Sequence, residues 1–213
     1  MKVLVGEKKV NPKTSDSDGR TPISWAAEHW HGEPCISYFE EASINLNLPD
    51  RTGRTLLSWA ASGGNVRLVK YLLKRTEVDL NLADGSYRTP LSWAAGEGRQ
   101  GAVQLLLEGA NIDPNFADKD GKTPLSWATE KGSQGSVQLL LDRVEVDPNL
   151  VDKYGRTPLS WAAEKESFGV VQLLLQRADV DPNLTDRRGR TPLSWAAEKG
   201  SQRTVQLILE RAN

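Results

Sequence analysis

The segment GRTPLSWAAEK at residues 155–165 recurs without change at residues 189–199. Outward from it, a tryptophan recurs every 34 residues, at Trp25, Trp59, Trp93, Trp127, Trp161 and Trp195. Aspartates keep the same period, at Asp16, Asp50, Asp84, Asp118, Asp152 and Asp186. Self-similarity at a fixed period is the mark of a repeat architecture. We therefore expect one domain over residues 1–213, with a partial repeat at 1–15 and repeats at 16–49, 50–83, 84–117, 118–151, 152–185 and 186–213.

Each repeat is predicted to contain two helices joined by turns. In the fifth repeat, Asp152-Lys-Tyr-Gly155 has the residues of a turn, since Asp can bond nearby backbone and Gly tolerates positive φ. Thr157-Pro158 then starts a helix, because Thr can cap it and Pro loses only an N–H that would have no partner. A second apolar helix follows over residues 170–175. One repeat of this size cannot bury its aliphatic groups alone, so stacking is expected to produce an all-α solenoid of antiparallel helix pairs.

These residues resemble the ankyrin repeat, whose signature includes Thr-Pro-Leu-His-x-Ala. The sequence reads Thr-Pro-Leu-Ser-Trp-Ala from Thr89, Thr123, Thr157 and Thr191. The resemblance implies β-hairpin or turn loops that protrude from a curved stack with a concave binding face. It also implies a non-catalytic role in protein binding. The Leu-Ser-Trp-Ala-Ala variant is similar to arrays in fungal multidomain proteins, some of which follow a nucleotide-binding signalling domain.

Two departures from the family pattern lead to structural predictions. Serine stands where the family usually has histidine, at Ser24, Ser58, Ser92, Ser126, Ser160 and Ser194. A serine hydroxyl is short, so we expect it to bond only within its own helix. Tyr87 occupies the turn position held elsewhere by Gly121 or Gly155. Because a tyrosine at positive φ is strained, this turn is predicted to shift so that Gly85 takes that conformation.

The two ends suggest that the chain is a piece, or the tail, of a longer array. Residues 2–12 align with residues 172–182, which places the start inside a second helix. The last unit, with Val205, Leu207, Ile208 and Leu209, lacks the polar face expected of a terminal cap.

Composition narrows the possible partners and compartment. The 27 basic and 28 acidic residues nearly balance, and a general nucleic-acid binder usually has a basic excess. We therefore expect no nucleic-acid or membrane partner. Cys35 is the single cysteine, and the N-terminus lacks the apolar core of a signal peptide. A monomeric array in the cell interior, in the cytoplasm, is the expectation.

No cofactor, metal or catalytic residue is predicted. His29, His31 and Cys35, with Glu28 or Glu33, could suggest a metal site, but zinc sites usually draw on two separated pairs, so we favour a turn. Asp118-Lys-Asp-Gly121 is too short for a calcium loop and is interpreted as a β-turn. Asp113-Pro-Asn115 has copies at residues 147–149 and 181–183, which favours hydrogen bonds that tie one link to the next, because an active site would need a single constellation.

Three sets of side chains are candidates for partner contact. The first is a basic ridge on the hairpin tips, with a solvated turn face as the alternative, at Arg20, Arg54, Arg88, Lys122, Arg156 and Arg190. The second comprises Glu130 and Glu164, expected near the concave face and offset in charge by the lysine that follows each. The third is the tryptophan stripe, including Trp59, Trp93, Trp127 and Trp161, for which packing is the favoured role, with one ring edge open to a partner.

Binding specificity is expected where the repeats differ. Those positions are His29, Ser62, Gly63, Tyr87, Gly96, Glu97, Thr129 and Glu166. The leading hypothesis is a protein-interaction scaffold that binds another protein through its hairpin tips and inner helices. The alternative is a structural or regulatory segment of a larger signalling protein, in contact with neighbouring domains or with copies of itself.

Overall fold

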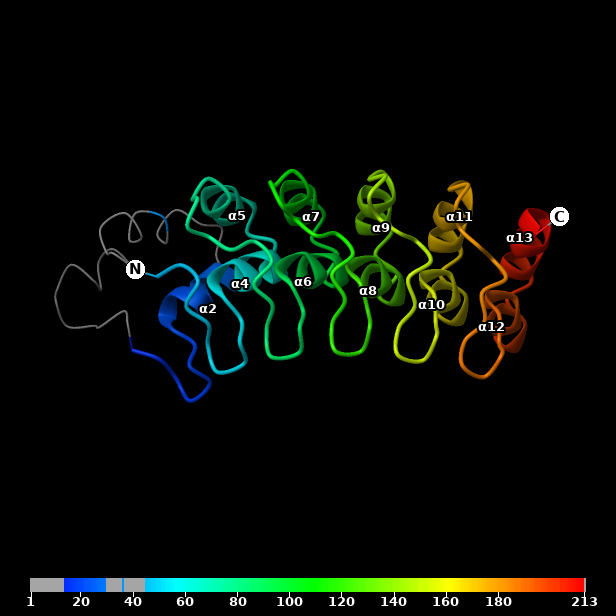
Figure 1. The fold of residues 1–213 in the computed structure, drawn as a ribbon, viewed down its shortest axis with the longest axis horizontal. Coiled ribbons are helices and arrows are strands. Elements are labelled where there is room, and N and C mark those ends of the chain that lie inside the picture. The colour runs from blue at the N-terminus through cyan, green and yellow to red at the C-terminus, as the bar shows by residue number, and fades with distance from the viewer. Residues whose placement is uncertain (1–13, 30–35, 37–44, 213) are drawn as a thin grey trace. The chain divides into compact units, whose positions relative to one another are not determined.

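A computed structural model describes residues 14–29, 36 and 45–212 (Figure 1). Its described residues form eleven helices and no strand. The helices are α2 (Pro22–His29), α4 (Leu56–Gly63), α5 (Val66–Leu72), α6 (Pro90–Gly96), α7 (Gln100–Leu107), α8 (Pro124–Glu130), α9 (Gln134–Leu141), α10 (Pro158–Glu164), α11 (Phe168–Gln176), α12 (Pro192–Glu198) and α13 (Gln202–Ala212). The all-helical repeat array predicted from the sequence is confirmed.

The chain divides into two compact units. Unit 1 contains the described residues of 1–94 and 101–112, and unit 2 contains those of 95–100 and 113–212. In unit 1, α4 packs against α2 and α5. In unit 2, the first helices α8, α10 and α12 pack in sequence, and the second helices α9, α11 and α13 do the same behind them. Whether residues 1–213 behave as one domain stays a prediction.

Threonine and proline start the first helices as the sequence predicts. In all six repeats, the threonine hydroxyl accepts a hydrogen bond of 3.1 to 3.3 Å from the backbone N–H of the serine three residues later. The serine hydroxyl pairs with the threonine of the same turn, as in Thr157 and Ser160 at 3.2 Å. The prediction that these serines bond within their own helix is confirmed, and they complete an N-terminal cap.

The core lies where the two helix layers of each unit meet. Most alanines of the first helices have no exposed surface, and neither do Leu68, Leu106, Leu140 and Leu174 of the second helices. The small alanine side chains let neighbouring helices approach closely, while the leucines fill the space behind them. The periodic sequence therefore specifies a continuous core within each unit.

Asparagine side chains tie each link to the next, as the repeated Asp-Pro-Asn motif predicts. The amide nitrogens of Asn47, Asn81, Asn115 and Asn149 each donate, at 2.6 to 2.7 Å, to a backbone carbonyl thirty residues later. The side-chain oxygens of Asn47, Asn115 and Asn149 accept from the backbone N–H of the aspartate that starts the next motif, at 2.9 to 3.0 Å. These asparagines therefore supply hydrogen bonds between neighbouring links, in the way that paired β-strands would.

Replacing Asn115 with alanine is expected to lower the free energy of unfolding by about 1–3 kcal/mol, because two backbone groups of the next link lose their partner. Chemical denaturation followed by circular dichroism measures the change. Asn183→Ala is the matched control, because the Asn183 side chain makes no such bonds among the described residues. Equal losses in the two variants would mean that the link bonds contribute little.

Candidate binding surface

In five of the six repeats, the opening aspartate fixes both the turn and the tryptophan. One carboxylate oxygen of Asp50 accepts from the backbone N–H of Thr52 at 2.9 Å and of Arg54 at 3.0 Å. The other oxygen accepts from the indole Nε1 of Trp59 at 2.9 Å. The same indole bond, at 2.9 to 3.0 Å, joins Trp25, Trp93, Trp127 and Trp161 to the aspartate nine residues earlier. These carboxylates are therefore structural, and the turn predicted at Asp118 in place of a calcium loop is confirmed.

The basic residues expected on an exposed ridge are instead inserted among tryptophan rings. In unit 1 the Arg54 guanidinium lies 3.4 Å from the ring centroid of Trp59 and 3.9 Å from that of Trp93. In unit 2 the Lys122 ammonium lies 4.6 Å from Trp127 and 4.3 Å from Trp161. We name this arrangement the tryptophan–cation ladder; it comprises Arg20, Arg54, Arg88, Lys122, Arg156 and Arg190 with the six periodic tryptophans. Cations over indole faces are held by the ring quadrupole, most strongly where water is excluded.

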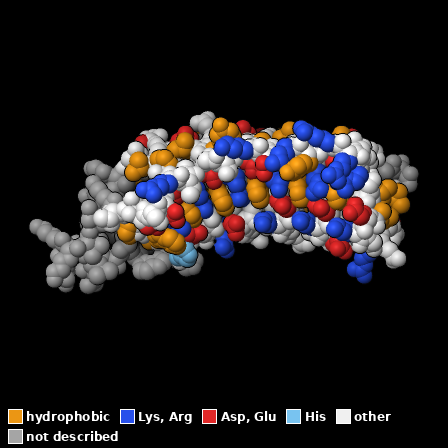
Figure 2. All heavy atoms as spheres, turned by 90° about the horizontal axis from the view of Figure 1, so that it is seen from below, with side chains coloured by type: hydrophobic (Ala, Val, Ile, Leu, Met, Phe, Trp, Pro, Cys, Tyr) orange, Lys and Arg blue, Asp and Glu red, His pale blue; other side chains and the backbone are white. Residues whose placement is uncertain are grey.

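Burial shows that the expected exposed ridge is wrong. Arg20, Arg54, Arg88 and Lys122 are buried, and Arg156 and Arg190 are partly so. The reason is that these side chains turn back from the loop into the gaps between indoles. Figure 2, which views the molecule from the side of the turns, shows hydrophobic, basic and acidic side chains alternating within each unit.

The glutamates at the ends of the first helices pair with the ladder. Glu130 lies 2.7 Å from Lys122, and Glu164 lies 2.8 Å from Arg156. The expectation that each is offset in charge by the following lysine is therefore wrong, because the ladder cation is the partner. Where Ser62 stands in the glutamate position, the Arg54 guanidinium donates to a backbone carbonyl, that of Ser58. Each of these cations thus keeps a hydrogen-bond acceptor.

Two pKa shifts follow from this geometry. Burial lowers the pKa of Arg54 to about 10, with nearby carboxylates opposing the shift. Arg54 therefore stays protonated at neutral pH, and the ladder keeps its charge. The indole of Trp25 lowers the pKa of Asp16 below its ordinary value by donating a hydrogen bond to the carboxylate.

The tryptophans are chiefly packing residues, as expected. Trp59, Trp161 and Trp195 are buried, Trp93 and Trp127 are partly exposed, and Trp25 is 45% exposed. With a cation on one or both faces, little ring surface is open at Trp59 or Trp161. Contact between these rings and a partner stays a prediction.

The side chains at the tips of the turns reach solvent, unlike most cations of the ladder. We define the turn tips as Ser17-Asp18, Arg51-Thr52, Gly85-Ser86-Tyr87, Lys119-Asp120, Lys153-Tyr154 and Arg187-Arg188. Backbone bonds join neighbouring tips, such as Gly85 N–H to Thr52 O at 2.8 Å and Arg187 N–H to Tyr154 O at 2.9 Å. Unlike the ladder, the tips change in sequence from repeat to repeat. The turn tips therefore present different side chains in each repeat on the same turn geometry.

Tyr87 adopts the conformation that the sequence analysis assigned to Gly85. Its φ is 65°, and its side chain is 56% exposed. The predicted shift of the turn is wrong, because Asp84 accepts from the backbone N–H groups of Ser86 and Arg88 as its counterparts do in the other repeats. The carboxylate holds the turn in the common geometry, and Tyr87 takes the left-handed position in place of glycine.

Glu166 is a second residue in a glycine position. Its φ is 54°, whereas the same place after the first helix is taken by Gly64, Gly98, Gly132 and Gly200. The Glu166 side chain is exposed. Of the other positions expected to confer specificity, His29 and Glu97 are exposed and Gly63 is partly exposed, whereas Ser62, Gly96 and Thr129 are buried.

The Tyr87→Gly variant is expected to be as stable as the parent, or more stable by up to about 1 kcal/mol, because glycine removes the left-handed strain. Thermal unfolding of the two proteins tests this. The control is the opposite change, Gly189→Ala, where φ is 74° and no atom lies within 4 Å of an added Cβ. It is expected to lose about 1 kcal/mol. A clear loss of stability on Tyr87→Gly would show that the tyrosine ring has a structural role.

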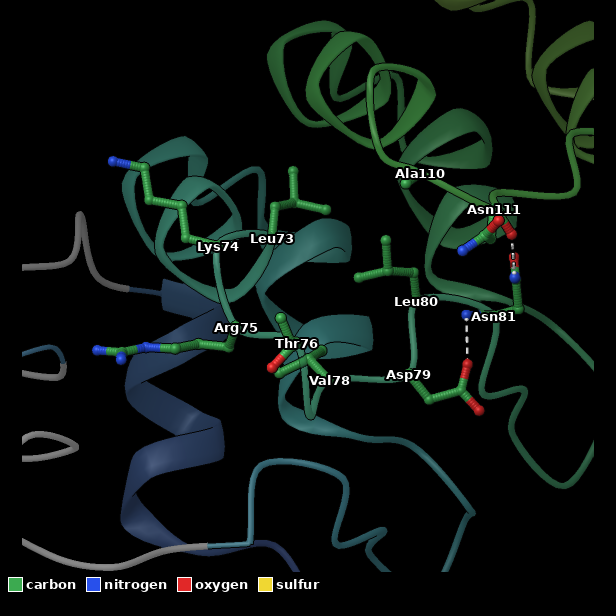
Figure 3. A pocket seen from close by; sticks show the side chains of 10 residues that line it. All are labelled: Leu73, Lys74, Arg75, Thr76, Val78, Asp79, Leu80, Asn81, Ala110 and Asn111. Atoms are coloured by element: carbon green, nitrogen blue, oxygen red, sulfur yellow. Dashed lines mark hydrogen bonds between the residues drawn. The ribbon is translucent and has the colours of Figure 1, made fainter.

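Unit 1 also has a pocket of about 370 Å³ beside the link that follows α5 (Figure 3). The Asn81 side chain faces Asn111 there and donates to its carbonyl at 2.6 Å, while the Asn81 N–H donates to Asp79 at 3.0 Å. These polar groups are used in the link bonds.

The part of the chain that the structure describes contains no cluster of three or more potential metal ligands. His31, Glu33 and Cys35, considered for a metal site, lie outside the described residues. Among the described helices, none has the length and apolarity needed to cross a bilayer.

Comparison with known proteins agrees with the fold. The family model described as ankyrin repeats (3 copies) matches residues 1–84, 76–152 and 141–213. No curated protein sequence matches the chain. The crystal structure of the ankyrin repeat domain of Bcl-3, described as a unique member of the IkappaB protein family, is similar, with 27% identity and a TM-score of 0.78 over 92% of this chain and 87% of that one. The periodic turns, caps and helix pairs and the family match together show that the chain belongs to the ankyrin repeat family.

Proposed function

We propose that the chain is a non-catalytic scaffold that binds another protein through its turn tips and the neighbouring ends of its first helices. The supporting observation is that, within each repeat, the residues that hold the fold together are not those that reach solvent. The periodic aspartates, tryptophans and basic residues are used in internal contacts, whereas the exposed turn tips differ between repeats. Ankyrin repeats are generally protein-interaction modules.

Tyr87 and Glu166 support the choice of surface. Each keeps a left-handed backbone that glycine adopts in the equivalent repeats, and each is exposed. Strained residues persist where the surrounding structure fixes them, and such residues cluster at functional sites. Exposed tyrosine also offers a large contact area at a low entropic cost.

The test is capture of partners from a lysate of the source cells, identified by mass spectrometry. The parent is compared with a Tyr87→Gly/Glu166→Gly variant, which returns both positions to the residue of the other repeats. The matched control is Gln138→Ala/Gln172→Ala, which changes two exposed residues on the second helices. Circular dichroism establishes that all three are folded.

We expect one protein to be captured by the parent and the control and lost by the glycine variant. If all three capture it equally, the turn tips are not the contact surface. If the parent captures only copies of itself, the structural or regulatory alternative replaces the scaffold.

A further inference from the structure

Unit 2 has a pocket of about 360 Å³ beside its last two turns. Tyr154, Arg187 and Arg188 come from the turn tips, and Arg190 and Trp195 come from the ladder. Tyr154 is half-exposed and both tip arginines are exposed, so the pocket can be reached from solvent. Figure 2 shows basic side chains gathered at this end of unit 2.

Positive charge exceeds negative charge at this pocket. The Arg156 guanidinium is paired with Glu164 at 2.8 Å, and the Arg190 guanidinium lies 3.0 Å from Asp186 and 3.7 Å from Glu198. Among the described residues, neither Arg187 nor Arg188 has a side-chain ion pair. Two guanidinium groups are therefore available to an anion.

Trp195 differs from the other periodic tryptophans in a way that points to the same pocket. It is 3% exposed, and its indole Nε1 is buried without a hydrogen-bond partner among the described residues. In the other five repeats this nitrogen donates to the aspartate nine residues earlier. Here the equivalent oxygen, Oδ2 of Asp186, lies 3.1 Å from Arg190 Nε and accepts from that side chain instead. The arginine thus occupies the acceptor that Trp195 would use.

We propose that this pocket binds an acidic segment of the partner protein, through a carboxylate or phosphate group held by Arg187, Arg188 and Arg190. The fork of an arginine matches both kinds of oxyanion and can hold either through two parallel hydrogen bonds. The anion draws Arg190 from Asp186, whose Oδ2 then accepts from Trp195 Nε1. Binding therefore gives the sixth repeat the tryptophan–aspartate hydrogen bond that the other five repeats already have. This inference names the chemistry of a partner and rests on the proposed function.

The test uses the 213-residue chain labelled with ¹⁵N, in which indole N–H signals report hydrogen bonding directly. The probes are hexaglutamate, the same peptide with one glutamate replaced by phosphoserine, and hexaglutamine as the neutral reference. A Trp195→Phe variant identifies the Trp195 signal. On addition of an acidic probe, this signal is expected to move towards those of the five bonded indoles, and more strongly at low salt.

Arg187→Ala/Arg188→Ala is expected to weaken binding by about tenfold or more, since each lost charge-assisted contact removes a substantial share of the affinity. Lys131→Ala/Arg203→Ala removes the same charge at exposed sites outside the pocket and is expected to bind as the parent does. Arg190→Gln is expected to show the bonded Trp195 signal without any probe, because Oδ2 of Asp186 then loses its arginine donor.

Either of two results would overturn the site: no shift with either acidic probe, or equal weakening in both double-alanine variants. Which probe binds more tightly distinguishes phosphate from carboxylate recognition. If the Arg187→Ala/Arg188→Ala variant captured the partner protein as well as the parent does, the anion site would be rejected and the scaffold function would stand. If the acidic peptide bound but no protein were captured, the anion site would stand and the scaffold function would be rejected.

Discussion

Replacing Trp161 with alanine is expected to lower the free energy of unfolding by about 3–5 kcal/mol. The ring is 7% exposed, and it lies against the side chains of both Lys122 and Arg156. Its loss would open a cavity, remove these contacts and a more distant one with Lys165, and leave Asp152 without the indole donor. Urea denaturation followed by circular dichroism measures the change.

The matched control is Trp25→Ala. Trp25 makes the same bond to its aspartate but is 45% exposed, so its removal leaves a smaller cavity and is expected to have a much smaller effect. A loss below about 1 kcal/mol for Trp161→Ala would contradict the packing role, because it would fall within the range of ordinary surface changes.

Replacing Lys122 with glutamate is expected to lower the free energy of unfolding by about 3–5 kcal/mol. Lys122 is 7% exposed and lies 2.7 Å from Glu130. The variant would bring two carboxylates together among indole faces, whose negative charge repels them. Urea denaturation is again the measurement, near neutral pH, where free glutamate is ionised.

Two variants separate this effect from a general change in charge. Lys122→Arg is expected to be tolerated, because arginine stands at this position in the other five repeats. Lys131→Glu makes the same charge change on an exposed side chain and is expected to alter stability by no more than about 0.5 kcal/mol. If Lys122→Glu proved as harmless as Lys131→Glu, the basic residues would be surface groups after all.

The ladder changes how binding experiments on this chain should be designed. Charge reversal at Arg88, Arg156 or Arg190 would test binding if these residues formed an exposed ridge. Each of these cations instead lies over a tryptophan ring. Such variants would be expected to disturb folding and binding together. Substitutions at the turn tips affect exposed side chains and leave the support intact.

Much of the fold could be predicted because local chemistry determined it. The Thr-Pro starts and the serine that bonds within its own turn follow from short-range hydrogen bonding that recurs in each repeat, whereas the asparagine ties between links were predicted from the recurrence of their motif. The direction of a long side chain does not follow in this way. Arg54 leaves its turn towards Trp59 and Trp93, and the second ring belongs to the next repeat.

A signal for the ladder was present in the sequence. Arg20 precedes Trp25 by five residues and follows Asp16 by four, and the same spacing recurs in all six repeats. Repetition argued for a structural role of the Asp-Pro-Asn motif, and it argues equally for the periodic cation. Tyr87 could not be placed correctly from its own propensity, because the bonds made by Asp84 determine the turn geometry.

The most direct test of the central claim is arginine modification of the intact folded chain with phenylglyoxal, mapped by mass spectrometry. The account predicts rapid modification of Arg187 and Arg188 and protection of Arg20, Arg54 and Arg88 until the protein is unfolded. Equally fast modification of both sets would contradict it, because the periodic cations would then form an exposed basic ridge and the ladder would not exist.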